Sequence, residues 1–132
     1  MKKATSEWVK KAEQDHVLAR HASRSKIPVH DGVCFHCQQC AEKYLKGLMA
    51  ELGLPLPKSH DLEPLLAALL VHHPRLRSLR RGLLFLAAFA VDTRYPGNSA
   101  SKRQAVAALR WADRVRAPAR ALLGIRERRH RK

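Results

Sequence analysis

The segment from Cys34 to Lys46 gathers three thiols, a histidine, two amides and a Glu-Lys pair, which are side chains that can bind metals, phosphate or protons. Cysteine together with histidine first suggests zinc. Cys34, Cys37 and Cys40, however, recur every three residues, and such positions on one straight helix do not converge on a tetrahedral centre. Their Cβ atoms would lie about 5–6 Å apart, too far for an unstrained disulfide. We therefore interpret them as free thiols in the core of a cytoplasmic protein, and we expect neither a metal nor a cofactor.

The same segment predicts a helix with two different faces. Its apolar face carries Cys34, Cys37, Ala41, Leu45, Leu48 and Leu52. Its second face carries His36, Cys40, Lys43 and Gly47, where the small residues would let another backbone approach and the other two present donors. Asp15 interrupts the apolar stripe of the preceding helix, and a buried carboxylate without a donor is very costly. Two interpretations stay open: these groups bind a phosphate or nucleotide, or they only satisfy Asp15.

The elements that must position these residues are helices. Leu and Ala dominate the 132 residues and aromatic residues make up only 5%, which favours an all-α domain. We expect about five helices, the second and fifth being the longest, at residues 5–24, 31–52, 62–72, 75–91 and 100–123. Asp31 and Asp61 are the expected N-caps of the second and third helices. Because the links are short, neighbouring helices should run antiparallel in an up-and-down bundle.

Apolar residues at helical spacing predict which side of each later helix faces the core. In the fourth helix these are Leu76, Leu79, Leu83, Leu86 and Ala90, and in the fifth Val106, Leu109, Ala112, Val115, Leu122 and Leu123. Residues 1–124 should form one domain, followed by a basic tail at 125–132 that is disordered in the free protein. No apolar run is long enough to span a membrane, so we expect no membrane partner.

The net charge of +15 narrows the classes of partner. A field of this sign and size attracts phosphate backbones or an acidic protein, although charge also serves solubility alone. The sequence contains no Gly-rich phosphate loop, no paired-carboxylate motif and no nucleophile elbow. These absences count against an autonomous enzyme.

The segment from Cys34 to Lys46 resembles the signature of HEPN domains (higher eukaryotes and prokaryotes nucleotide-binding), which reads approximately Cys-Phe-His-x-Gln-Gln-x-x-Glu-Lys-x-Leu-Lys. The likeness covers nearly the whole chain, since it extends to Trp8, Ala12 and Asp15, to His60-Asp61-Leu62 and to Arg94-Tyr95-Pro96. The resemblance implies a helical bundle that is usually dimeric and often encoded beside a minimal nucleotidyltransferase. In many branches it also implies a metal-independent ribonuclease.

The candidate ligand-binding residues are Asp15, His36, Gln39, Lys43, His60, Arg94 and Tyr95. Lys43 and Arg94 would attract phosphate, while Asp15 would orient their side chains. His60 has a plainer alternative as an ordinary loop histidine. The ribonuclease branch is recognised by Arg followed after four to six residues by His on a late helix, and Arg94 has no histidine at those distances. The obvious base for a ribose 2′-hydroxyl is therefore missing, and we assign no catalytic residue.

These observations predict a non-catalytic protein that binds a nucleotide or nucleic acid and acts with a minimal nucleotidyltransferase. We also expect a homodimer through the face that carries His36, Cys40, Lys43 and Gly47. Two alternatives stay open. One is a purely docking, regulatory subunit of that partner, and the other is a ribonuclease toxin of the HEPN class with an atypical active site.

Overall fold

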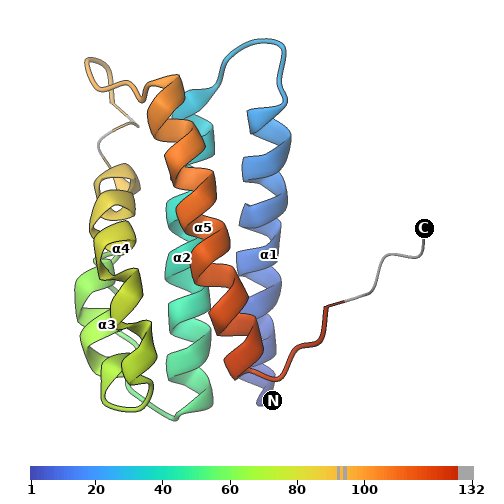
Figure 1. The fold of residues 1–132 in the computed structure, drawn as a ribbon, viewed down its shortest axis with the longest axis vertical. Coiled ribbons are helices and arrows are strands. Elements are labelled where there is room, and N and C mark those ends of the chain that lie inside the picture. Colours follow the sequence, from blue (N-terminus) through green and yellow to red (C-terminus); the bar gives the residue numbers. More distant parts are fainter. Residues whose placement is uncertain (92, 94, 128–132) are drawn as a thin grey trace.

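Three long helices and two short ones form the bundle shown in Figure 1, a computed structural model of the chain. The structure describes residues 1–91, 93 and 95–127. The long helices are α1 (Lys3–Ser23), α2 (His30–Glu51) and α5 (Lys102–Leu122), and the short ones are α3 (Leu62–Leu70) and α4 (Arg80–Ala87). The 3₁₀ segments η1 (Pro74–Leu79) and η2 (Ala88–Ala90) flank α4. No strand occurs in the described part of the chain, and the predicted all-α bundle is confirmed.

The helix α2 lies at the centre and packs against α1, α3, α4 and α5 (Figure 1). Thirteen of its 22 residues are buried, because it has neighbours on several sides. Its predicted apolar face is buried from Cys34 to Leu48, and Leu52 is half-buried. It is the longest helix, but α1 equals α5 at 21 residues, so the predicted order of lengths holds only for α2. Among the described helices, none combines the length and the apolar composition that crossing a membrane requires.

One of the two predicted N-caps is correct and the other is wrong. The carboxylate of Asp61 caps α3 by accepting a hydrogen bond from the Glu63 N–H at 3.2 Å. Asp31, in contrast, lies inside the first turn of α2, which begins at His30 and has no side-chain cap. Its Oδ1 accepts instead from the backbone N–H of Ala100, at 2.6 Å. Asp31 therefore ties the start of α2 to the segment that leads into α5.

The predicted fourth helix is divided into η1, α4 and η2. Its inward residues Leu76, Leu79, Leu83, Leu86 and Ala90 are all buried, as predicted. Leu76 and Leu79 are three residues apart, which matches the three-residue turn of a 3₁₀ helix. The same stripe of apolar residues therefore faces the core through both kinds of helix.

The predicted inward face of α5 is partly wrong. Val106 and Leu122 are 48% and 45% exposed, whereas the fully inward positions are Ala105, Ala108, Ala112, Val115 and Ala119. Most of this face is alanine, which lets the α5 backbone approach α2 closely. The prediction placed the large apolar side chains of this helix inward, but the face that turns towards the core is the one that carries the small alanine side chains.

The predicted division into a domain and a basic tail stays a prediction. Residues 128–132 lie outside the described part of the chain. Of the described tail residues, Ile125 is half-buried and packs against the core.

We predict that Gly82→Ala destabilises the protein, although alanine is the better helix former. A Cβ atom at Gly82 would lie 2.0 Å from Cε3 of Trp111, so α4 and α5 would have to move apart. The free energy of unfolding, measured by urea denaturation, should fall by roughly 1–3 kcal/mol, as in other overpacked cores. Gly32→Ala is the matched control, since nothing lies within 4 Å of its Cβ position. Equal stability of Gly82→Ala and the unmodified protein would contradict this prediction.

Candidate functional site

The small residues on the second face of α2 receive α1 of the same chain. A Cβ atom at Gly47 would lie 3.4 Å from the Cβ of Trp8, and Cys40 is fully buried. We predicted that a second copy of the chain would approach these small residues closely, but α1 of the same protomer does so instead. The dimer itself stays a prediction, but the proposed face is wrong for it, because α1 covers that face.

Asp15 is the centre of the contact between α1 and α2. Its side chain is only 8% exposed, and its two carboxylate oxygens meet different partners on α2. His36 Nδ1 lies 2.9 Å from Oδ1, and Lys43 Nζ lies 2.5 Å from Oδ2. The two partners are seven residues apart, which places them two turns apart on one face of α2. The structure thus brings together three of the predicted site residues and satisfies the buried charge.

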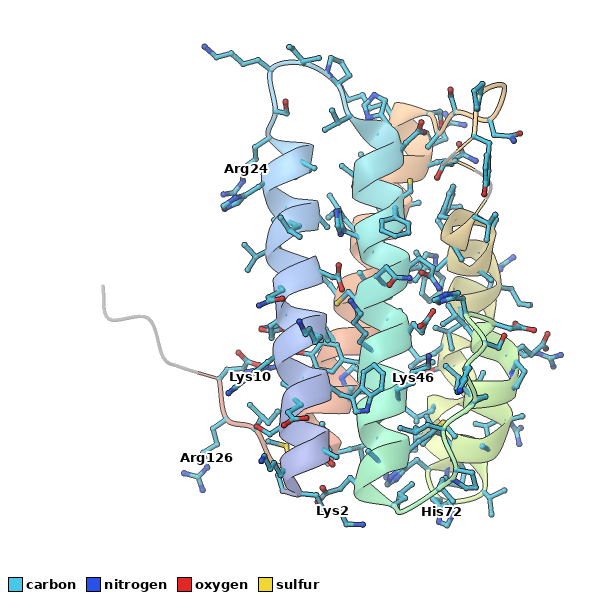
Figure 2. All side chains as sticks on the ribbon, turned by 180° about the vertical axis from the view of Figure 1, so that it is seen from behind. Lys2, Lys10, Arg24, Lys46, His72 and Arg126 are labelled. Carbon is cyan, nitrogen blue, oxygen red and sulfur yellow. The ribbon has the colours of Figure 1, made fainter. Side chains whose placement is uncertain are left out.

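Lys43 also lines a large, open depression of the surface. This depression has a volume of about 790 Å³ and is lined by Ala4, Glu7, Trp8, Lys10, Lys11, Gln14 and Lys43. Three lysines face one glutamate there, so the depression is cationic. Figure 2 shows Lys10 projecting from α1 and Lys46 from α2; the Lys46 Nζ lies 5.5 Å from the centre of the Trp8 ring. Volumes of roughly 300–1,000 Å³ are typical of sites for small ligands.

Glu42 forms a second buried network on α2. Its side chain is 3% exposed and receives Lys46 Nζ at 3.1 Å, His60 Nδ1 at 3.0 Å and Gln38 Nε2 at 3.1 Å. The Gln39 amide donates to Gln38 Oε1 at 2.6 Å. Two more predicted site residues, His60 and Gln39, therefore belong to this network and do not contact Asp15. The i, i+4 spacing of Glu42 and Lys46 is the signal in the sequence that predicts their contact.

The loop before α5 does not contribute a described contact to either network. Tyr95 is 59% exposed, and none of the hydrogen bonds between described residues joins its side chain to α1 or α2. Arg94 lies outside the described residues. The predicted convergence of this loop with Asp15, His36 and Lys43 therefore stays a prediction.

The three cysteines are buried inside the core and are free thiols. Burial, together with the charge of Asp31, raises the pKa of Cys34 to about 12. Burial likewise raises the pKa of Cys37 and Cys40 well above the usual range. The thiols are therefore protonated at neutral pH, which disfavours both reaction and metal binding. No group of His, Cys, Asp and Glu side chains suited to a metal occurs among the described residues.

Sequence reasoning missed a third network, which joins α1 to α5. Glu13 accepts from Arg116 at 2.7 and 2.8 Å and from the Tyr44 hydroxyl, and Arg120 lies 3.4 Å away. Burial alone would raise the pKa of Glu13, but the hydrogen bonds from Arg116 and Tyr44 and the two guanidinium charges lower it to about 2. Glu13 and Arg116 are 103 residues apart, and no local pattern connects them.

The family model of the HEPN domain matches residues 5–122. The match begins within α1 and ends with α5, so it includes the Asp15 contact and the Glu42 network. Neither a curated protein nor a solved structure matches the chain significantly.

We predict that Glu13→Gln lowers the free energy of unfolding by about 1–3 kcal/mol at pH 7, as expected for charge-assisted hydrogen bonds. The folded pKa lies below the ordinary value of 4.5, so the stabilisation is complete above pH 4.5 and is lost as the pH falls towards 2. The difference between the two proteins in urea denaturation should therefore shrink across that range. Glu7→Gln, an exposed change on the same helix, is the control. A difference that does not vary with pH would disprove this role of Glu13.

Proposed function

Because this chain belongs to the HEPN family, we propose that it binds a nucleotide or single-stranded RNA, without cleaving it, in the depression beside Asp15 and Lys43. Family membership indicates a nucleotide- or RNA-related function. The observation that carries the proposal is the double role of Lys43, which is held by the buried Asp15 and also lines the depression. The finer points, namely the ligand, its position and the absence of cleavage, are our inference.

The composition of the depression supports an anionic, ring-bearing ligand. Lys10, Lys11 and Lys43 offer ammonium groups to phosphate, and Lys43 loses little rotational freedom on binding because Asp15 already orders it. Trp8 offers a ring on which a base can stack, a contact worth about 1–3 kcal/mol per base. Because unpaired bases are free to stack on a protein side chain in this way, a single-stranded ligand is favoured over a duplex.

A second candidate function is a ribonuclease with an atypical site, and the contact between His36 and Asp15 favours it. A carboxylate that holds one ring nitrogen of a histidine is the usual arrangement of a general base. Two observations argue against it. The sequence has no histidine at the required distances after Arg94, and none of the residues that line the depression is a histidine.

We further propose that the protein acts in the cytoplasm with a minimal nucleotidyltransferase, as the resemblance implies, and that it forms a homodimer. The net charge of +15 supports an acidic partner. The three buried free thiols support a reducing compartment. The dimer needs a surface other than the face of α2 that α1 covers.

We predict that Lys10→Glu/Lys11→Glu weakens binding of a fluorescein-labelled oligo-uridine by roughly tenfold or more, as expected from the loss of two phosphate contacts. Arg75→Glu/Arg77→Glu, on the exposed side of η1, makes the same change in charge away from the depression. In a Trp111→Phe background, quenching of the remaining Trp8 fluorescence by oligo-uridine or ATP would report stacking. Equal loss of affinity in both double variants would show that RNA only adheres to the basic surface.

The purified protein should leave single-stranded and structured RNA intact, with or without magnesium, because no histidine is among the residues that line the depression and none follows Arg94 at the required distances. Gel analysis of labelled RNA over several hours measures this. His36→Asn, whose amide can still donate to Asp15, is the informative variant. Cleavage by the unmodified protein that His36→Asn abolishes would establish the ribonuclease alternative in place of the proposed function.

A further inference from the structure

A smaller groove lies between the end of α1, the link to α2 and the first half of α5. Its volume is about 270 Å³, below the roughly 300–1,000 Å³ of sites for cofactor-sized ligands. It shares no lining residue with the depression at Trp8. A groove of this size accommodates apolar side chains of a partner better than a nucleotide.

Apolar side chains line the groove and remain exposed at its edges. Val33 is buried at its floor, and Leu109 is half-buried in its wall. Val106 and Val29 lie at its edges and are 48% and 41% exposed, and Ile27, which precedes Val29 by two residues, is also exposed. Contiguous exposed apolar surface of this kind marks interaction sites on soluble proteins.

Five exposed cations lie on the segments that form the groove, and we call them the groove rim: Arg24, Lys26, Lys102, Arg103 and Arg110. Lys102 lines the groove itself, and Arg103 and Arg110 lie one turn on either side of Val106 on the same face of α5. Figure 2 shows Arg24 at the end of α1, pointing away from the bundle. No cation of the groove rim forms an ion pair with a described residue.

We propose that this groove docks an acidic amphipathic helix of a partner protein. Apolar residues of that helix would enter between Val29 and Val106, while its carboxylates would meet the groove rim. The proposal concerns a different face from the depression at Trp8, and it rests on the acidic protein partner of the proposed function, for which it names a docking surface and a kind of docking segment.

The charges around the groove favour this occupant over a second copy of the chain. Two copies joined through the groove would bring both groove rims together, in molecules that each carry +15, and like charges across an interface repel. RNA would meet the cations but not fill the apolar floor, because the half-buried His30 is the one aromatic ring among the residues that line the groove. An acidic helix with an apolar face matches both features.

The probe is a fluorescein-labelled synthetic helix that carries leucine at every third or fourth position and glutamate between them. Its control is a scrambled peptide of the same composition, which keeps the charge and loses the apolar face. The full chain should bind the amphipathic peptide at least about tenfold more tightly than the scrambled one, measured by fluorescence polarisation. Amide resonances of Val29, Val106 and Leu109 should shift on binding.

Two pairs of variants assign the binding to the groove. Val106→Asp should weaken binding of the amphipathic peptide about tenfold, whereas Val71→Asp, the same change at an exposed valine at the end of α3, should not. Arg103→Glu/Arg110→Glu should weaken it more than Arg75→Glu/Arg77→Glu. Because all these side chains are exposed, circular dichroism should show each variant folded.

Four results would overturn the proposal. Equal binding of both peptides, or equal loss in the groove variants and their controls, would reduce the effect to unspecific charge attraction. Weaker binding of oligo-uridine to Val106→Asp, without loss of peptide binding, would make the groove an RNA site. A dimer in sedimentation that Val106→Asp dissociates would show that a second copy occupies the groove.

Discussion

Two buried carboxylates, Asp15 and Glu42, constrain how the first helices of this bundle pack. Asp15 lies against α2 and Glu42 is part of α2. Both side chains have almost no exposure to water, and each would destabilise the fold by several kcal/mol if its charge were unpaired. Proteins of this size are stable by only about 5–15 kcal/mol, so neither charge can be left without a partner. His36 and Lys43 satisfy Asp15, and Lys46 contributes to satisfying Glu42. The rotation of α1 about its axis is therefore restricted to the one that presents Asp15 to α2.

The same constraint orders side chains at the edge of the depression. Lys43 is fixed by Asp15 at the edge of the depression, and Gly47 lets Trp8 come close to α2 beside it. Charged side chains on a helix surface are normally mobile, and ordering them on binding costs free energy. For Lys43, part of this ordering already takes place when the protein folds, because the side chain pairs with Asp15. Pairing with Asp15 and the proposed ligand binding are therefore compatible roles for Lys43.

The depression at Trp8 and the groove at Val106 are two separate surfaces of the bundle, and the positive net charge of the protein acts on both. The net charge of +15 would draw polyanions and acidic proteins to both surfaces alike, so charge alone does not distinguish them. The two surfaces differ instead in their size and in the apolar side chains that line them. The depression at Trp8 is the larger of the two and combines lysines with an indole ring, whereas the groove at Val106 is smaller and most of its lining is apolar. We infer that the choice of partner at each surface depends on the side chains between the cations, namely the Trp8 ring in the depression and the apolar side chains in the groove.

The amino-acid sequence alone determined the features that depend on neighbours a few residues apart. These are the helical composition, the Asp61 cap, the buried stripe from Leu76 to Ala90 and the HEPN resemblance that the family match confirms. Helical spacing also grouped His36 with Lys43 correctly. The tertiary structure decided the rest, because the pairing of distant groups depends on how helices approach and rotate. That geometry pairs Asp31 with Ala100 and His60 with Glu42. It also places the alanines of α5, rather than Val106, in the core.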